Sequence, residues 1–189
     1  ESVLGLEAVL ADGTVIPAMN RMLKNNAAYD VKQLFIGTEG TLGVITRLVL
    51  RLRESPRSTQ SALVACPTFT DVTRLLKHID GTLGGSLSAF ELMWNEFYRM
   101  VTTPPSKGTP PLPQTYDYYV LVESAGGDPT RDQAQFEEAI AAAIEAGLVV
   151  DAAVCSSEAQ RDALWALRDD VEGLFRLGMP VAFDVSLPL

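Results

Sequence analysis

The sequence lacks most of the residues that common catalytic and metal sites require. It has one histidine and two cysteines among 189 residues, which is too few for the usual zinc ligand sets. No nucleophile elbow accompanies the histidine, so a Ser-His-Asp triad is excluded as well. His78 lies off the apolar side of its predicted helix, and we expect an exposed side chain without a chemical role. The sequence therefore predicts no metal site in this chain.

Long apolar runs and disulfide frameworks are also missing. No apolar run approaches the ~18 residues that a membrane-spanning helix needs. Cys66 and Cys155 fit small buried residues of strands better than a disulfide, which favours a reducing compartment. We therefore expect a cytoplasmic protein.

Positive charge is scarce and unevenly placed. The chain has 15 Lys and Arg against 24 Asp and Glu, a net charge of −9, of which residues 1–60 carry +1 and residues 61–189 carry −10. An acidic surface repels phosphate backbones, so nucleic-acid binding is excluded. The nearly neutral first part remains suited to an anionic cofactor.

The chain is 47% hydrophobic and 21% charged, which is typical of a globular protein with one ample core or two modest ones. The first residues already resemble structured sequence and the last follow a strand-like run, so we expect both ends to be cuts through a longer protein. Residues 54–58 form the predicted linker, because Pro56 blocks a strand and the charge balance changes there. We therefore predict two domains, residues 1–55 and 56–189.

Residues 1–55 contain turn signals between short strand patterns. Residues at alternate positions before the Asp12-Gly13 turn form a strand pattern, which predicts a hairpin over residues 5–16. A helical turn at 31–36, a loop with three glycines at 37–43 and a strand at 44–53 follow, with the apolar side chains of that strand on one face.

Residues 56–189 predict an α+β fold. Periodicity, capping residues and glycines place strands at 60–66, 86–93, 116–124 and 148–155, and helices at 68–80, 95–101 and 128–147. This order is that of a ferredoxin-like antiparallel sheet with helices on one face. Five prolines make 103–115 an exposed loop, and a long helix at 158–177 and a strand at 180–186 complete the chain. Phe136, Ile140 and Ile144 are predicted to share one buried helix face.

The glycine loop is the first candidate site. Gly37, Gly40 and Gly43 recur every third residue, and glycine allows main-chain N–H groups to face a phosphate or a flavin edge. The spacing matches neither the Rossmann fingerprint nor a Walker loop, so the glycines by themselves favour a tight structural turn.

The wider segment resembles a known family. Residues 24–46, with Gly37-Thr38-Glu39-Gly40-Thr41-Leu42-Gly43 at their centre, resemble a signature of FAD-linked oxidases of the vanillyl-alcohol-oxidase type, and residues 6–15 resemble the hairpin before it. The resemblance implies the end of a PCMH-type FAD-binding domain and FAD as cofactor. It places six residues along the flavin or its pyrophosphate: Gly37, Glu39, Gly40, Gly43, Val44 and Ile45.

The second candidate site is a stripe on the long helix. Arg161, Trp165, Arg168 and Glu172 follow at helical spacing, beside an apolar face. An arginine in this position can present its fork to a carboxylate. The alternative is a pair between Arg168 and Glu172 on a solvated face.

Segments 164–168 and 183–188 resemble the cap domain of D-2-hydroxyglutarate, D-lactate and glycolate-oxidising flavoproteins. The resemblance implies that Arg168 grips the substrate carboxylate. Residues 88–93 resemble a cap strand of the same family, which directs Glu91 toward the flavin site, although an outward-facing strand carboxylate is the alternative. Ala182 stands where relatives that take a dicarboxylate have lysine, and Glu172 replaces a small hydroxyl residue. Both departures argue against hydroxyglutarate itself.

The resemblance implies an FAD-dependent oxidoreductase that moves a hydride from a D-2-hydroxy acid to flavin. Its metal ligands and catalytic base are expected beyond residue 189, and the isolated chain, with half a flavin site, is expected to be inactive. Oxidase and dehydrogenase activity stay open, as does the electron acceptor. The alternative is a non-enzymatic ferredoxin-like module that binds a small ligand or forms a homodimer.

Overall fold

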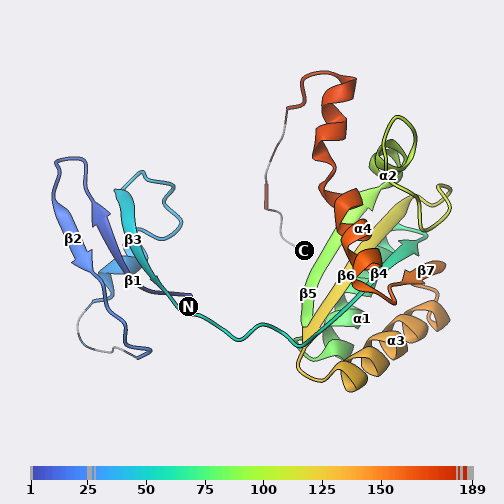
Figure 1. Cartoon of the computed structure of the whole chain (residues 1–189), viewed down its shortest axis with the longest axis horizontal. Coiled ribbons are helices and arrows are strands. Elements are labelled where there is room, and N and C mark those ends of the chain that lie inside the picture. Colours follow the sequence, from blue (N-terminus) through green and yellow to red (C-terminus); the bar gives the residue numbers. More distant parts are fainter. Residues whose placement is uncertain (1, 25–26, 28, 182, 184, 187–189) are drawn as a thin grey trace. The chain divides into compact units, whose positions relative to one another are not determined.

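The structure, a computed structural model, describes residues 2–24, 27, 29–181, 183, 185 and 186. The chain divides into two compact units, Glu1–Ser55 and Pro56–Leu189 (Figure 1). The boundary lies inside the segment in which proline was expected to end a strand. Each unit is described by itself below.

The first unit is a three-stranded antiparallel sheet. Its strands are β1 (Val3–Val9), β2 (Val15–Ala18) and β3 (Val44–Leu50), in the order β2-β1-β3, with a short 3-10 helix η1 (Val31–Leu34) before β3. The predicted hairpin is confirmed: Gly13 has a φ of 84°, and the Thr14 N–H donates to Asp12 Oδ1 over 2.9 Å. A left-handed glycine after aspartate is a common way to close such a turn.

The core of the first unit is small. Its buried hydrophobic residues are Leu6, Ala8 and Phe35. The apolar face predicted for the third strand exists but is not buried, since Val44 is 62% exposed and Leu48 and Leu50 are also exposed. The first unit therefore presents a bare apolar strand face.

The second unit contains a four-stranded antiparallel sheet. Its strands are β4 (Ser58–Cys66), β5 (Leu87–Trp94), β6 (Tyr118–Gly126) and β7 (Asp151–Val154), and their order is β5-β6-β4-β7. With α1 (Phe69–Leu83) after β4 and α3 (Pro129–Glu145) after β6, this is the predicted ferredoxin-like topology. The α+β fold class is confirmed.

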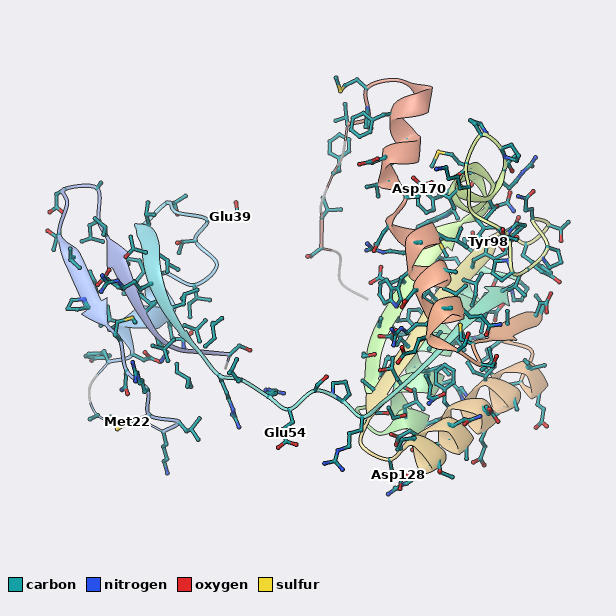
Figure 2. All side chains as sticks on the ribbon, viewed as in Figure 1. Met22, Glu39, Glu54, Tyr98, Asp128 and Asp170 are labelled. Atoms are coloured by element: carbon teal, nitrogen blue, oxygen red, sulfur yellow. The ribbon has the colours of Figure 1, made fainter. Side chains whose placement is uncertain are left out.

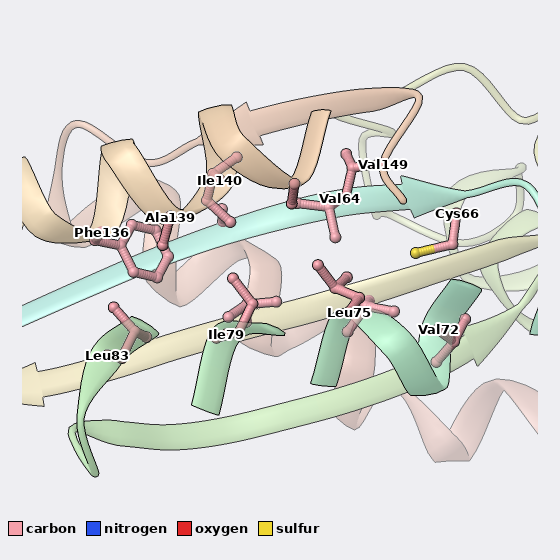
Figure 3. Close-up of a cluster of buried hydrophobic side chains, with 14 residues drawn as sticks. Val64, Cys66, Val72, Leu75, Ile79, Leu83, Phe136, Ala139, Ile140 and Val149 are labelled. Carbon is pink, nitrogen blue, oxygen red and sulfur yellow. The ribbon is translucent and has the colours of Figure 1, made fainter. Parts of the chain in front are cut away.

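Helices α1 and α3 cover one face of this sheet (Figure 3). Both start at predicted caps: Thr68 accepts from the Asp71 N–H, and Asp128 accepts from two N–H groups of the first turn of α3. Buried α1 side chains interlock with α3 residues over the sheet; they are Val72, Leu75, Ile79 and Leu83 on α1 and Phe136, Ala139, Ile140 and Ala143 on α3.

Two predictions about this face were wrong. Ile144 is 45% exposed, because Ala143 takes the buried position of the last turn of α3. His78 is half-buried rather than exposed: its Nε2 lies 3.1 Å from the Ala139 carbonyl oxygen of α3 and donates to it in the matching tautomer. The imidazole thus links α1 to α3, and its role is structural.

The expectation of helices on one face was incomplete. Helices α2 (Asn95–Thr102) and α4 (Glu158–Asp169) cover the opposite face. Tyr98 of α2 stacks on Tyr119 of β6 with ring centroids 3.8 Å apart, and its Oη donates to the Leu112 carbonyl oxygen over 2.9 Å. Because Leu112 is buried here, the proline-rich loop at 103–115 is partly packed on the sheet rather than wholly exposed.

The predicted helix at 158–177 is interrupted. Helix α4 ends at Asp169, Asp170 has a φ of −73° and a ψ of 51°, and a 3-10 helix η2 (Val171–Leu177) follows. Ser106 Oγ donates to Asp170 Oδ2 over 3.0 Å, so the loop at 103–115 contacts the break. The predicted apolar face stops there as well, since Val171 and Phe175 are exposed.

The predicted strand at 180–186 was also wrong for the residues that the structure describes. Residues 180, 181, 183, 185 and 186 are not in a strand. Ala182, on which the argument against hydroxyglutarate partly depended, lies outside the described residues.

Candidate functional site

The glycine loop has an unusual backbone. Gly37 and Gly40 each have a φ of 81°, and Glu39 between them has a φ of 51°. A Cβ at either glycine would meet no atom within 4 Å, so their conformation, and not lack of space, requires glycine. Figure 2 shows Glu39 on this loop, which leads into β3.

Two threonine side chains make hydrogen bonds within the loop, and its last glycine packs closely against β1. Thr38 Oγ1 donates to the Phe35 carbonyl oxygen over 2.9 Å, and Thr41 Oγ1 donates to the Thr38 carbonyl oxygen over 2.7 Å. A Cβ at Gly43 would lie 3.0 Å from the Val9 carbonyl oxygen. Gly43 is therefore a packing requirement, distinct from the two exposed glycines.

Several main-chain donors of this loop have no acceptor among the described residues. The N–H groups of Gly37, Glu39 and Gly40 make no hydrogen bond there, and all three residues are exposed. Free N–H groups on a glycine loop are suited to phosphate or flavin oxygens. Val44 and Ile45, the next predicted contacts, extend the loop into β3 with exposed side chains. The loop thus fits the cofactor that the sequence suggested.

The first unit has a further hollow that sequence reasoning missed. It encloses about 830 Å³ and includes Lys24, Lys32 and Arg51, but no residue of the glycine loop. Lys32 pairs with Asp30. The excess of positive charge in residues 1–60 was consistent with such a hollow, but the sequence did not indicate which residues line it.

In the second unit the structure brings Arg168 and Glu91 together. Arg168, in the last turn of α4, donates from Nε to Glu91 Oε2 on β5 over 3.0 Å and from Nη1 to Asp169 Oδ1 over 2.9 Å. Its Nη2 forms an ion pair with the same Glu91 oxygen at 2.9 Å. The carboxylates of Asp169 and Glu91 raise the pKa of Arg168. The predicted alternative of an Arg168–Glu172 pair is wrong, because the helix ends before Glu172.

The Arg168–Glu91 pair is half-exposed. The side chains are 41% and 34% exposed, and such ion pairs contribute about 0–1 kcal/mol. A carboxylate ligand can therefore exchange with Glu91 at low cost. Glu91 faces the same side of the sheet as Met93, the side covered by α2 and α4, so the plain outward-facing reading of Glu91 is wrong.

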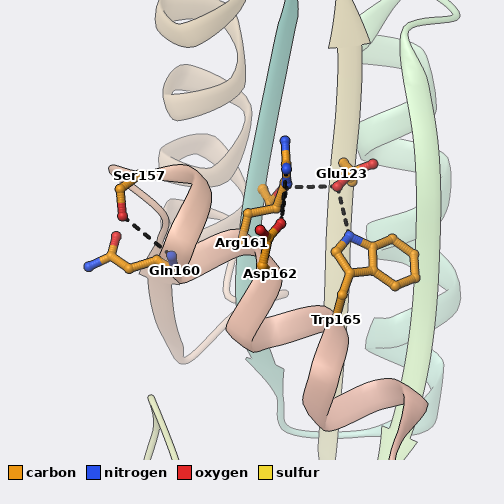
Figure 4. A network of polar contacts seen from close by, with 7 residues as sticks. Glu123, Ser157, Gln160, Arg161, Asp162 and Trp165 are labelled. Atoms are coloured by element: carbon orange, nitrogen blue, oxygen red, sulfur yellow. Dashed lines mark hydrogen bonds and ion pairs between the residues drawn. The ribbon is translucent and has the colours of Figure 1, made fainter.

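A second carboxylate of this face, Glu123, was missed. Glu123 on β6 accepts from Trp165 Nε1 over 2.8 Å (Figure 4). It also accepts from the hydroxyls of Ser61 and Ser88 over 3.1 and 3.3 Å. The signal in the sequence was a single glutamate in an otherwise apolar strand. Arg161, from the same helix stripe, pairs with its neighbour Asp162.

A hollow of about 280 Å³ lies next to Arg168. Six residues line it: Glu91, Leu92, Met93, Trp94, Phe97 and Arg168. An anion at the guanidinium would thus have apolar surface beside it.

Other chemistries find less support. Within the part of the chain that the structure describes, no group of three or more His, Cys, Asp or Glu side chains is placed to hold a metal ion, and no helix is long and apolar enough to cross a membrane. Burial raises the pKa of the Cys66 thiol to about 12, which disfavours the nucleophilic thiolate. Cys155 is half-buried just after β7, and burial also raises its pKa.

The second unit matches a known protein family. Residues 55–189 match the family described as FAD linked oxidases, C-terminal domain, and the chain belongs to this family. This finding opposes the alternative of an unrelated ferredoxin-like module.

The similar proteins are hydroxy acid dehydrogenases. Over its whole length the chain is 38% identical to D-2-hydroxyglutarate dehydrogenase of Rattus norvegicus, 40% to that of Bos taurus and 37% to a putative D-lactate dehydrogenase of Schizosaccharomyces pombe. It covers 35%, 34% and 36% of those proteins, so it spans about a third of their length.

Solved structures of other proteins share the fold. The chain matches alkyldihydroxyacetonephosphate synthase with a TM-score of 0.65 at 15% identity, covering 93% of this chain and 33% of that one. It matches p-cresol methylhydroxylase with a TM-score of 0.63 at 12% identity, covering 92% and 40%. At these identities the likeness concerns the fold alone.

The expectation of a cytoplasmic protein is overturned. The relatives from rat, cattle and fission yeast are mitochondrial by name. A low cysteine count and the lack of a long apolar run do not separate the two compartments, since neither feature reports targeting.

Proposed function

We propose that the protein containing this chain is an FAD-dependent dehydrogenase of D-2-hydroxy acids. The observation that carries the proposal is the similarity to D-2-hydroxyglutarate dehydrogenases along the whole chain. Residues 1–55 are the end of its FAD-binding domain, of the PCMH type, and residues 56–189 are the first part of its substrate-side cap.

The glycine loop holds part of the cofactor in this proposal. The free N–H groups of Gly37, Glu39 and Gly40 are donors for its oxygens, and Gly43, Val44 and Ile45 continue the contact surface. Bound FAD supplies a hydride acceptor. A Cβ at Gly40 would strain a φ of 81°, so Gly40→Ala in the full-length protein should weaken FAD binding more than Gly127→Ala, where a Cβ also has open space but φ is ordinary.

Arg168 binds and orients the substrate carboxylate. Arg168 lies in the last turn of α4, and its guanidinium is half-exposed and forms a weak ion pair with Glu91. Binding of a carboxylate at one fork would fix the adjacent α-carbon and its hydroxyl in position. Glu91 holds the guanidinium in place until the substrate arrives.

The test is anaerobic flavin reduction by D-2-hydroxy acids in the full-length protein. Arg168→Ala should raise KM and lower kcat/KM about a hundredfold or more, on the scale of a lost charge-assisted bidentate contact. Arg161→Ala is the matched control, because Arg161 lies on the same helix and also pairs with its sequence neighbour. Equal activity of Arg168→Ala and wild type contradicts the assignment.

The remaining details belong to the same proposal. Glycolate, the smallest and achiral 2-hydroxy acid, belongs in the substrate panel. The isolated chain should neither bind FAD tightly nor turn over, because part of a cofactor site buries too little of the ligand. Titration of FAD into this chain and into the full-length protein compares the two directly. Homodimer formation stays a prediction.

A further inference from the structure

We infer that the preferred substrate is a 2-hydroxy monocarboxylate with an uncharged, apolar side chain, and not a dicarboxylate. This inference rests on the proposed function and on the proposed role of Arg168. It follows from the charges and surfaces that surround the guanidinium.

The charge of Arg168 is already matched. Its guanidinium contacts Glu91 Oε2 at 2.9 Å and Asp169 Oδ1 at 2.9 Å, so two carboxylates face one cation. One substrate carboxylate can replace Glu91 at the fork, which leaves the local charge unchanged if Glu91 moves away. A second substrate carboxylate would add a negative charge beside Glu91 and Asp169.

Among the residues that the structure describes, the hollow beside Arg168 offers no other cation. Among its six lining residues Arg168 is the one positive side chain and Glu91 the one negative side chain, and the other four are apolar. Arg161 lies on the same helix but pairs with Asp162. A substrate tail that leaves Arg168 along this hollow would therefore meet no group that compensates a charge.

Met93 and Phe97 are the apolar side chains of the hollow on the Arg168 side of the sheet. Phe97 is half-buried, so it has surface that an alkyl or aryl tail can cover. Removal of such surface from water favours binding, whereas a charged tail would lose solvation there. Both effects favour the same substrate class.

The test compares two acids of equal carbon number in the full-length flavoprotein: D-2-hydroxypentanoate and D-2-hydroxyglutarate. We expect kcat/KM for anaerobic flavin reduction to be at least about tenfold higher with the monocarboxylate. Equal or better reduction by the dicarboxylate overturns the inference and leaves the proposed function standing. Reduction by neither acid overturns the proposed function and the inference with it.

Two variants test the reasons for the preference. Phe97→Ala should raise KM for D-2-hydroxypentanoate at least about fivefold and leave KM for D-2-hydroxyglutarate nearly unchanged. Glu91→Gln removes one negative charge and should improve kcat/KM for the dicarboxylate relative to the monocarboxylate at least about threefold. Phe69→Ala is the control, since Phe69 is an exposed aromatic residue that packs on Trp94 and Tyr118 at the opposite face of the sheet and does not line the hollow. Equal changes with both acids in either variant overturn the inference.

Discussion

Gly108 should be the least replaceable glycine of the second unit. It lies in the loop at 103–115, where a Cβ would come within 2.3 Å of Leu167 Cδ2 and within 2.3 Å of the Val101 carbonyl oxygen. Carbon atoms in contact normally lie about 3.5–4.0 Å apart. The leucine tip can rotate away, but the carbonyl belongs to α2 and cannot move without its helix.

The cost of Gly108→Ala follows from this geometry. Overpacking in a well-packed region costs about 1–3 kcal/mol, and we expect the upper half of that range because one clash is with the backbone. With a urea dependence of about 2 kcal/mol per molar, a loss of about 2 kcal/mol lowers the unfolding midpoint by about 1 M. Trp94 and Trp165 both lie in the second unit, so their fluorescence reports its unfolding.

Gly81→Ala is the matched control. Gly81 lies within α1, and a Cβ there would meet no atom within 4 Å. Alanine is the better helix former, so this variant should gain about 0.5–1 kcal/mol. If Gly108→Ala unfolds at the wild-type midpoint while Gly81→Ala is stabilised, the packing of the loop against α2 and α4 is wrong.

Three more predictions concern buried polar groups. Trp165→Phe removes the donor to Glu123 and should cost about 1–2 kcal/mol; the free energy of unfolding followed by circular dichroism checks this, and an unchanged value contradicts the bond. Tyr98→Phe removes a buried hydroxyl that donates to the Leu112 carbonyl oxygen and accepts from its N–H, so it should cost about 1–3 kcal/mol in the same assay, and a neutral effect argues against the contact. The pKa of Cys66 is raised by burial from 9.0 to about 12, so its contribution to stability is complete below about pH 9 and is lost as the pH rises toward 12. Stability measured from pH 8 to 11 should fall less steeply in Cys66→Ala, and parallel curves contradict this.

Secondary structure was predictable where local chemistry decides it. Thr68 and Asp128 cap their helices as expected, and the Asp12-Gly13 turn closes its hairpin. These features depend on a few neighbouring residues, so the sequence carries them directly. The ferredoxin-like order followed from the succession of elements.

The candidate site was only half predictable. Arg168 and Glu91 were each identified, but their pairing joins residues 77 positions apart. Glu123 escaped notice because its donor Trp165 lies 42 positions away. Pairs of this kind depend on which helix covers which face of the sheet, and that choice leaves no local pattern.

The sequence by itself determined the strands of the two sheets, the helix caps and the family resemblance, since each depends on short stretches of chain. Tertiary structure decided where α4 ends, because the break at Asp170 is bonded to Ser106, 64 positions away. It also decided that α2 and α4 cover the second sheet face, and therefore that Arg168 pairs with Glu91. Helical periodicity continues past Asp170 in the sequence, whereas in the structure α4 ends at Asp169, next to the residue that accepts from Ser106 of a distant loop.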